Sequence, residues 1–131
     1  MSPLEEGILD IVNEEVGDAL RVVAIGTVTD EGRSYSIPYA REDVISEYTE
    51  SDREAILNDL ILEAFHTDKQ ERLYQAGDLQ GTIRVFEETA VLLFLAQAEP
   101  NPKGVLVSVE PVAFDRLPAI LERGLEYCNR R

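Results

Sequence analysis

The chain has 131 residues, the length of one domain, and its 44% of hydrophobic residues can form one core. Acidic residues outnumber basic residues 26 to 12, so the formal net charge is -14. Such a surface repels the phosphates of nucleic acids and the headgroups of anionic membranes. We therefore expect neither nucleic acid nor membrane as a partner.

The basic residues are biased toward arginine, since Lys69 and Lys103 are the only lysines. Together with the excess of carboxylates, this bias predicts adaptation to a salt-rich cytoplasm, where a short screening length weakens the repulsion between like charges. Residues 1–7 lack the basic start and apolar stretch of a signal peptide, and the longest apolar run, residues 90–96, is too short to span a bilayer. We expect a cytoplasmic protein.

A first helix is predicted to begin at Ser2, with Pro3 as its first helical residue and Glu5 completing a capping box. Apolar residues then recur every three or four positions from Leu4 to Leu20, which is typical of a helix with one face against a core.

A β-hairpin follows, because residues 21–29 are largely β-branched or small and residues 30–33 favour a turn. Tyr35, Ile37 and Tyr39 alternate with polar or small neighbours, which predicts an edge strand with both tyrosines on one side. Exposed tyrosines suit recognition surfaces, so Tyr35 and Tyr39 are candidate interface residues.

The centre of the chain, residues 42–74, is helical in character, and its strongest amphipathic part runs from Ile56 to Phe65. Gly77 and Gly81 bracket a polar loop, after which three strands are predicted, at residues 82–87, 90–98 and 104–110. A last helix begins near Asp115.

The segment from Ala90 to Ala96 is apolar at every position, so both faces of this strand require cover. This places the strand inside the sheet and predicts helices on both faces. The last helix repeats apolar residues from Leu117 to Cys128 on one face, and we interpret Cys128 as a core residue rather than a nucleophile.

This order of one helix, two strands, one helix, three strands and one helix resembles the roadblock/light-chain and profilin-like folds. The resemblance implies one α+β domain over residues 1–131, with a five-stranded antiparallel sheet, the central helix on one face and the terminal helices on the other. Four short segments are also similar to a family of small, acidic, uncharacterised haloarchaeal proteins; they are residues 17–23, 40–48, 82–87 and 104–108.

Candidate catalytic groups are few. Asp59, Glu63 and His66 have a spacing that could place them on one helix face and hold a divalent metal, or they are solvated residues near the end of that helix, which is the interpretation that we favour. The sequence contains no glycine-rich phosphate loop, nucleophile elbow or paired-histidine motif. We therefore assign no catalytic, cofactor or metal residues and favour a non-enzymatic function.

The resemblance to roadblock proteins implies a homodimeric interaction or regulatory module, of the kind that serves small GTPases or motor-type machinery. The edge strand at residues 82–87 makes Arg84 and Phe86 candidate interface residues, since Arg84 could face Glu87 of a second copy, whereas Pro38 removes a donor from the other edge. A small-ligand sensor, with its ligand beside the central strand, is the alternative. A metal-dependent enzyme and a DNA regulator have less support.

Overall fold

The computed structural model describes residues 2–96 and 101–129. Five strands form one antiparallel sheet in the order β2-β1-β5-β4-β3. Their bounds are β1 (Leu20–Thr29), β2 (Gly32–Ala40), β3 (Gly81–Val85), β4 (Ala90–Ala96) and β5 (Lys103–Val109). The predicted α+β fold with a five-stranded antiparallel sheet is confirmed, and β2 and β3 are its two edges.

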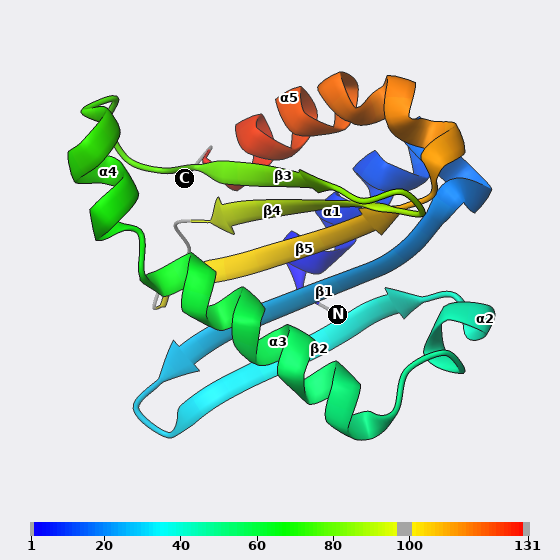
Figure 1. Cartoon of the computed structure of the whole chain (residues 1–131), viewed down its shortest axis with the longest axis horizontal. Coiled ribbons are helices and arrows are strands. Elements are labelled where there is room, and N and C mark those ends of the chain that lie inside the picture. Colours follow the sequence, from blue (N-terminus) through cyan, green and yellow to red (C-terminus); the bar gives the residue numbers. More distant parts are fainter. Residues whose placement is uncertain (1, 97–100, 130–131) are drawn as a thin grey trace.

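The helices occupy both faces of this sheet (Figure 1). Their bounds are α1 (Pro3–Val16), α2 (Glu42–Ile45), α3 (Glu50–Phe65), α4 (Asp68–Tyr74) and α5 (Leu117–Cys128), with short 3-10 turns η1 (Gly17–Ala19) and η2 (Pro111–Arg116). The central helix α3 crosses one face alone, while α1 and α5 pack side by side on the other. We call these the α3 face and the α1/α5 face.

The α1/α5 face carries the larger core. Ile8 and Val12 of α1 and Ile120 of α5 are almost fully buried against Phe94 and other apolar side chains of the sheet. Strand β4 lies in the sheet interior, as its uninterrupted apolar run predicted, although β5 occupies the central position. Cys128 is buried in the same core.

The α3 face depends on close approach between helix and sheet. A Cβ atom on Gly26 would lie 2.9 Å from Ile61 Cγ1, and one on Gly104 would lie 2.8 Å from Ala64 Cβ. Glycine at both positions therefore allows the second half of α3 to rest on β1 and β5. The rest of this face has a smaller buried cluster, built around Leu57, Leu60 and Leu93 and neighbouring residues.

Two irregularities interrupt the pairing of β1. Opposite β5, the register passes from Leu20–Val109 directly to Val22–Ser108, so Arg21 is an extra residue on β1. Opposite β2, residues 37 and 38 together face Ala24. Each is a β-bulge, which inserts one residue and redirects the side chains beyond it.

The ends of several elements differ from those predicted. Ser2 caps α1 by accepting a hydrogen bond from the Glu5 amide at 3.2 Å, but the Glu5 carboxylate accepts one from Ser36 Oγ of β2. Strand β3 ends at Val85, because the Phe86 amide donates to the Thr89 carbonyl at 2.8 Å and starts the turn to β4 there. The end of the predicted strand at residues 90–98 lies outside the described residues.

Candidate functional site

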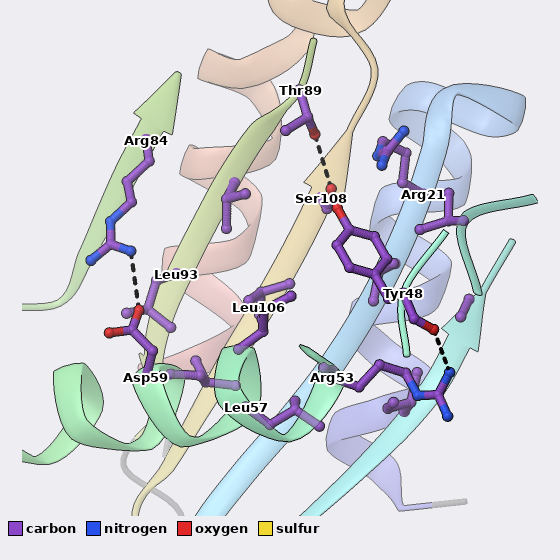
Figure 2. A pocket seen from close by; sticks show the side chains of 18 of the residues that line it. Arg21, Tyr48, Arg53, Leu57, Asp59, Arg84, Thr89, Leu93, Leu106 and Ser108 are labelled. Atoms are coloured by element: carbon purple, nitrogen blue, oxygen red, sulfur yellow. Dashed lines mark hydrogen bonds and ion pairs between the residues drawn. The ribbon is translucent and has the colours of Figure 1, made fainter. Parts of the chain in front are cut away.

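A large groove lies on the α3 face, between α3 and the sheet, with a volume of about 1060 Å³. Its floor is apolar and includes Val22, Ala24, Val91, Leu93 and Leu106 from three adjacent strands, with Leu57 and Leu60 of α3 as one wall. Figure 2 shows Leu57, Leu93 and Leu106 along the groove and Arg21, Ser108 and Thr89 toward one end. The volume is at the upper end of the range for small-ligand pockets.

Part of the rim of the groove is also apolar. Its large apolar side chains are between 37% and 53% exposed: Ile37, Ile45, Tyr48, Ile56 and Phe86. Exposed apolar side chains that gather in one place are unusual on a surface that otherwise carries a net charge of -14. Such a gathering of exposed apolar side chains is typical of a contact or binding surface.

Arg21 supplies the charge at the polar end of the groove. The bulge in β1 directs its side chain to the α3 face, where it is only 14% exposed. Its Nε is buried and has no hydrogen-bond partner among the described residues, and its Nη2 lies 3.8 Å from Glu47 Oε2, beyond hydrogen-bond distance. This guanidinium is desolvated without being paired well, which is costly.

Two hydroxyl groups lie at the same end. Thr89 Oγ1 donates to the Val109 carbonyl at 2.9 Å and lies 3.0 Å from Ser108 Oγ. Ser108 is the one buried polar residue of the described chain, and it lies opposite Val22 across the β1–β5 pair. Because Thr89 donates its one proton to a carbonyl, Ser108 is the donor of the Ser108–Thr89 hydrogen bond and keeps its lone pairs at the groove end.

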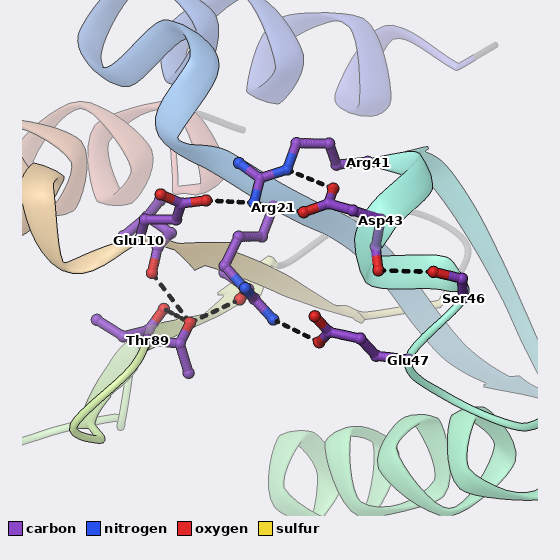
Figure 3. A network of polar contacts seen from close by, with 10 residues as sticks. Arg21, Arg41, Asp43, Ser46, Glu47, Thr89 and Glu110 are labelled. Carbon is purple, nitrogen blue, oxygen red and sulfur yellow. Dashed lines mark hydrogen bonds and ion pairs between the residues drawn. The ribbon is translucent and has the colours of Figure 1, made fainter.

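A second arginine, Arg41, anchors the segment around α2 that closes the polar end of the groove (Figure 3). Arg41 binds both carboxylate oxygens of Asp43, pairs with Glu110 and donates to the Asp18 carbonyl at 3.0 Å. The Arg41 guanidinium lowers the pKa of Asp43, and the hydrogen bonds that Arg41 donates to Asp43 and Glu110 raise the pKa of Arg41. The network anchors the start of α2, and the chain continues from there to Glu47 and Tyr48.

Arg84 has its partners within the chain. It reaches from β3 to α3, where Nη1 lies 3.2 Å from Asp59 Oδ2 and the other Nη pairs with Glu63. The charge that favoured Arg84 as a contact with Glu87 of a second copy is therefore neutralised by α3. The same ion pairs turn Asp59 and Glu63 toward the groove, whereas His66 is an exposed residue that ends α3.

No group of three histidine, cysteine or carboxylate side chains within residues 2–96 and 101–129 is close enough to hold a metal. None of the helices described in these ranges is long and apolar enough to cross a membrane.

The two candidate tyrosines do not share a face. Tyr35 pairs with Gly26, which faces α3, but Tyr39 pairs with Val23 and packs against the core of the α1/α5 face. The alternation fails because the bulge at residues 37 and 38 adds one residue between the tyrosines. Phe86 lines the groove from the β3 side and is 53% exposed.

Sequence reasoning missed Arg21 and the groove. The signal was a lone arginine between Leu20 and Val22, at the start of a strand that is otherwise apolar or small. The groove itself left no motif, because its floor is made of the same residue types as a packed core.

Known structures share this fold. The gliding protein MglB from Thermus thermophilus has 12% sequence identity to the chain and a TM-score of 0.58, covering 99% of this chain and 91% of its own. MglB with a tetrameric arrangement has 14% identity and a TM-score of 0.56, covering 99% and 90%. The predicted roadblock-like architecture is thereby confirmed.

No curated protein matches the sequence. Residues 6–129 match the domain of unknown function DUF7522, and the chain belongs to that family.

Proposed function

We propose that this chain is a non-enzymatic interaction or regulatory module that acts as a homodimer, with a protein partner, in a salt-rich cytoplasm. The observation that carries this proposal is the uncovered apolar edge at β3. Ile83, Val85 and Phe86 are 38%, 63% and 53% exposed at the end of the sheet. An apolar edge strand with unpaired backbone groups favours pairing with another strand.

The other edge is less suitable. Strand β2 carries Pro38, which lacks an amide proton. Its bulge also disturbs the regular spacing of the backbone donors and acceptors with which a partner strand would pair. Strand β3 contains no proline, and its pairing with β4 runs without a register shift from Gly81 to Val85. Two β3 strands related by a two-fold axis would pair antiparallel, a contact that closes at two copies.

The shared fold with MglB is consistent with self-association, because one of the two structures is described with a tetrameric arrangement. The groove on the α3 face remains accessible in this proposal and is the surface that we assign to a partner or ligand. Apolar pairing through Ile83 and Val85 replaces the charge pairing through Arg84, which α3 already satisfies.

Light scattering in molar potassium chloride tests the homodimer. We expect a dimeric wild type and a monomeric Val85→Asp variant, since an unpaired carboxylate within the contact costs about 2 kcal/mol or more. Val112→Asp is the matched control, because Val112 is 77% exposed and belongs to η2 rather than to β3. A monomeric wild type, or a dimer that Val85→Asp leaves intact, would contradict the proposal.

The salt-rich setting has its own test. With 26 acidic and 12 basic residues, the surface repels itself when salt is removed. We expect the melting temperature, followed by circular dichroism, to fall as salt is withdrawn. A melting temperature independent of salt would count against a haloarchaeal origin and a salt-rich cytoplasm.

A small-ligand sensor is the second candidate function. The specific observation that favours it is the groove beside β5 and β4, which combines an apolar floor with the buried guanidinium of Arg21. Such a combination is typical of sites that bury the body of a ligand and orient it with a few polar groups.

A further inference from the structure

At the polar end of the groove, the Arg21 guanidinium has a hydrogen-bond donor without a partner among the described residues. This donor is the buried Nε, and the only ion pair of Arg21 among those residues, to Glu47, is 3.8 Å long and involves a carboxylate that is 57% exposed. A guanidinium presents up to five donors and binds a carboxylate through two parallel hydrogen bonds. An anion at this end would satisfy the donors that the protein leaves open.

We propose that the groove binds an amphipathic monocarboxylate, with its carboxylate on Arg21 and its apolar body on the floor between the sheet and α3. This inference rests on the sensor function proposed above and names its ligand class. Leu93 and Leu106 form the floor beyond Ser108, so a ligand anchored at Arg21 extends along them toward Leu57 (Figure 2).

The chemistry of the end favours a single negative charge. Thr89 donates to the Val109 carbonyl, so Ser108 Oγ donates to Thr89 and can reach a carboxylate oxygen only by exchanging that hydrogen bond. Arg53, another arginine that lines the groove, donates to the Tyr48 carbonyl at 3.1 Å and is partly exposed. Arg41 is bound to Asp43 and Glu110. The one largely buried guanidinium, that of Arg21, matches one carboxylate.

The side of the groove away from Arg21 disfavours a second charged group on the ligand. Asp59 and Glu63 share the single guanidinium of Arg84, so this side carries one net negative charge. A second anionic group on the ligand would meet these carboxylates, and a cationic headgroup would meet Arg21 at the other end. The groove therefore suits a ligand that is anionic at one end and apolar along the rest.

Decanoate and decan-1-ol are suitable probes, since they share an apolar chain and differ in charge. Binding is measured in molar potassium chloride by calorimetry and by the methyl resonances of Leu93 and Leu106. We expect decanoate to bind more tightly than decan-1-ol and to shift the Nε–H resonance of Arg21. Arg21→Leu should weaken decanoate binding about 10- to 100-fold and leave decan-1-ol binding unchanged.

Two variants complete the experiment. Arg21→Lys keeps the charge but loses the planar pair of donors, so it should restore only part of the decanoate affinity. Arg72→Leu removes the same charge from exposed α4 and should bind decanoate as the wild type does. Methyl spectra of the free variants report whether each one is folded.

The possible outcomes distinguish failure of the carboxylate assignment from failure of the proposed sensor function. If both probes bind equally and Arg21→Leu changes neither, the groove is an apolar site and the carboxylate assignment is wrong, while a sensor function stands. If neither probe moves the methyl resonances of Leu93 and Leu106, the sensor function fails as well. Loss of decanoate binding in Arg72→Leu would show a general charge effect and overturn the role of Arg21.

Discussion

The two faces of the sheet are built differently. On the α1/α5 face, two helices cover the sheet, and Phe94, Ile120 and Val107 are almost fully excluded from water. On the α3 face, one helix crosses diagonally and leaves a groove of about 1060 Å³ beside it. The same sheet therefore supports a complete core on one side and an open apolar surface on the other.

The two faces therefore make different contributions: the α1/α5 face stabilises the fold, and the α3 face provides an accessible surface. Burial of apolar area stabilises a fold roughly in proportion to the area removed from water, so the α1/α5 face supplies most of the stabilisation. The α3 face leaves apolar side chains and one buried guanidinium incompletely satisfied, which is tolerable only because the other face is well packed. Substitutions on the two faces should therefore lower the free energy of unfolding by different amounts.

The largest expected effect comes from a charge placed on each face of β4. Phe94 points into the α1/α5 core and Leu93 into the α3 cluster, although they are neighbours in sequence. Phe94→Asp should unfold the protein, because an unpaired buried charge costs several kcal/mol against a total stability of about 5–15 kcal/mol. Leu93→Asp should destabilise less, since the groove admits water to the new carboxylate.

Urea denaturation of both variants in molar salt measures this difference. Equal losses of stability, or a Leu93→Asp variant that is less stable than Phe94→Asp, would show that the α3 face is packed as tightly as the other face.

A smaller effect is expected from added methyl groups. A Cβ on Gly124 of α5 would lie 2.5 Å from Phe94 Cζ, inside a packed core that cannot yield without moving α5. Gly124→Ala should lower the free energy of unfolding by about 1–3 kcal/mol. Gly104→Ala, at 2.8 Å from Ala64 Cβ, should cost less, because α3 can shift toward the open groove.

Chemical denaturation again compares the two alanine variants, and crystal structures would show which helix has moved. A larger loss in Gly104→Ala than in Gly124→Ala would reverse the proposed order of rigidity.

The smallest effect is a pH dependence confined to the α1/α5 side. Arg123 and Arg116, through hydrogen bonds and charge, hold the pKa of Glu15 below its usual 4.5. Because the folded pKa is depressed, this contribution is fully present above the unfolded pKa and is lost as pH falls through the folded pKa. Glu15→Gln should therefore flatten the decline in melting temperature below about pH 4.5.

Glu31→Gln, in the exposed turn between β1 and β2, controls for the loss of one negative charge. If the melting temperatures of the wild type and Glu15→Gln fall in parallel as the pH is lowered, Glu15 does not cause the acid-induced loss of stability. High salt should reduce the difference but not abolish it, since the Glu15 side chain is largely covered and pairs with two arginines.

Much of the fold was predictable because it depends on periodicity. The apolar run of β4 required cover on both faces, and the helical repeats around Ile61 and Ile120 identified what covers them. The sheet order followed from the resemblance to roadblock-like folds. These features depend on many residues, so one irregular position does not disturb them.

The site was less predictable because it depends on single inserted residues. The bulge at Arg21 turns a charged side chain toward the groove, and the bulge at residues 37 and 38 moves Tyr39 to the opposite face from Tyr35. Period-two patterns assume regular pairing and give no sign of either bulge. The ion pairs of Arg84 likewise depend on where α3 crosses the sheet, which local sequence does not specify.

The strand order also has a kinetic consequence. The β1–β2 and β3–β4 hairpins are local in sequence, but the two halves of the sheet join only where β1 pairs with β5, as in Leu20 opposite Val109. Contacts of such long sequence separation slow folding because a large loop must close first. During synthesis the β1–β2 hairpin has both edges open, and α1 lacks its neighbour α5, until β5 and α5 at residues 103–128 have been made.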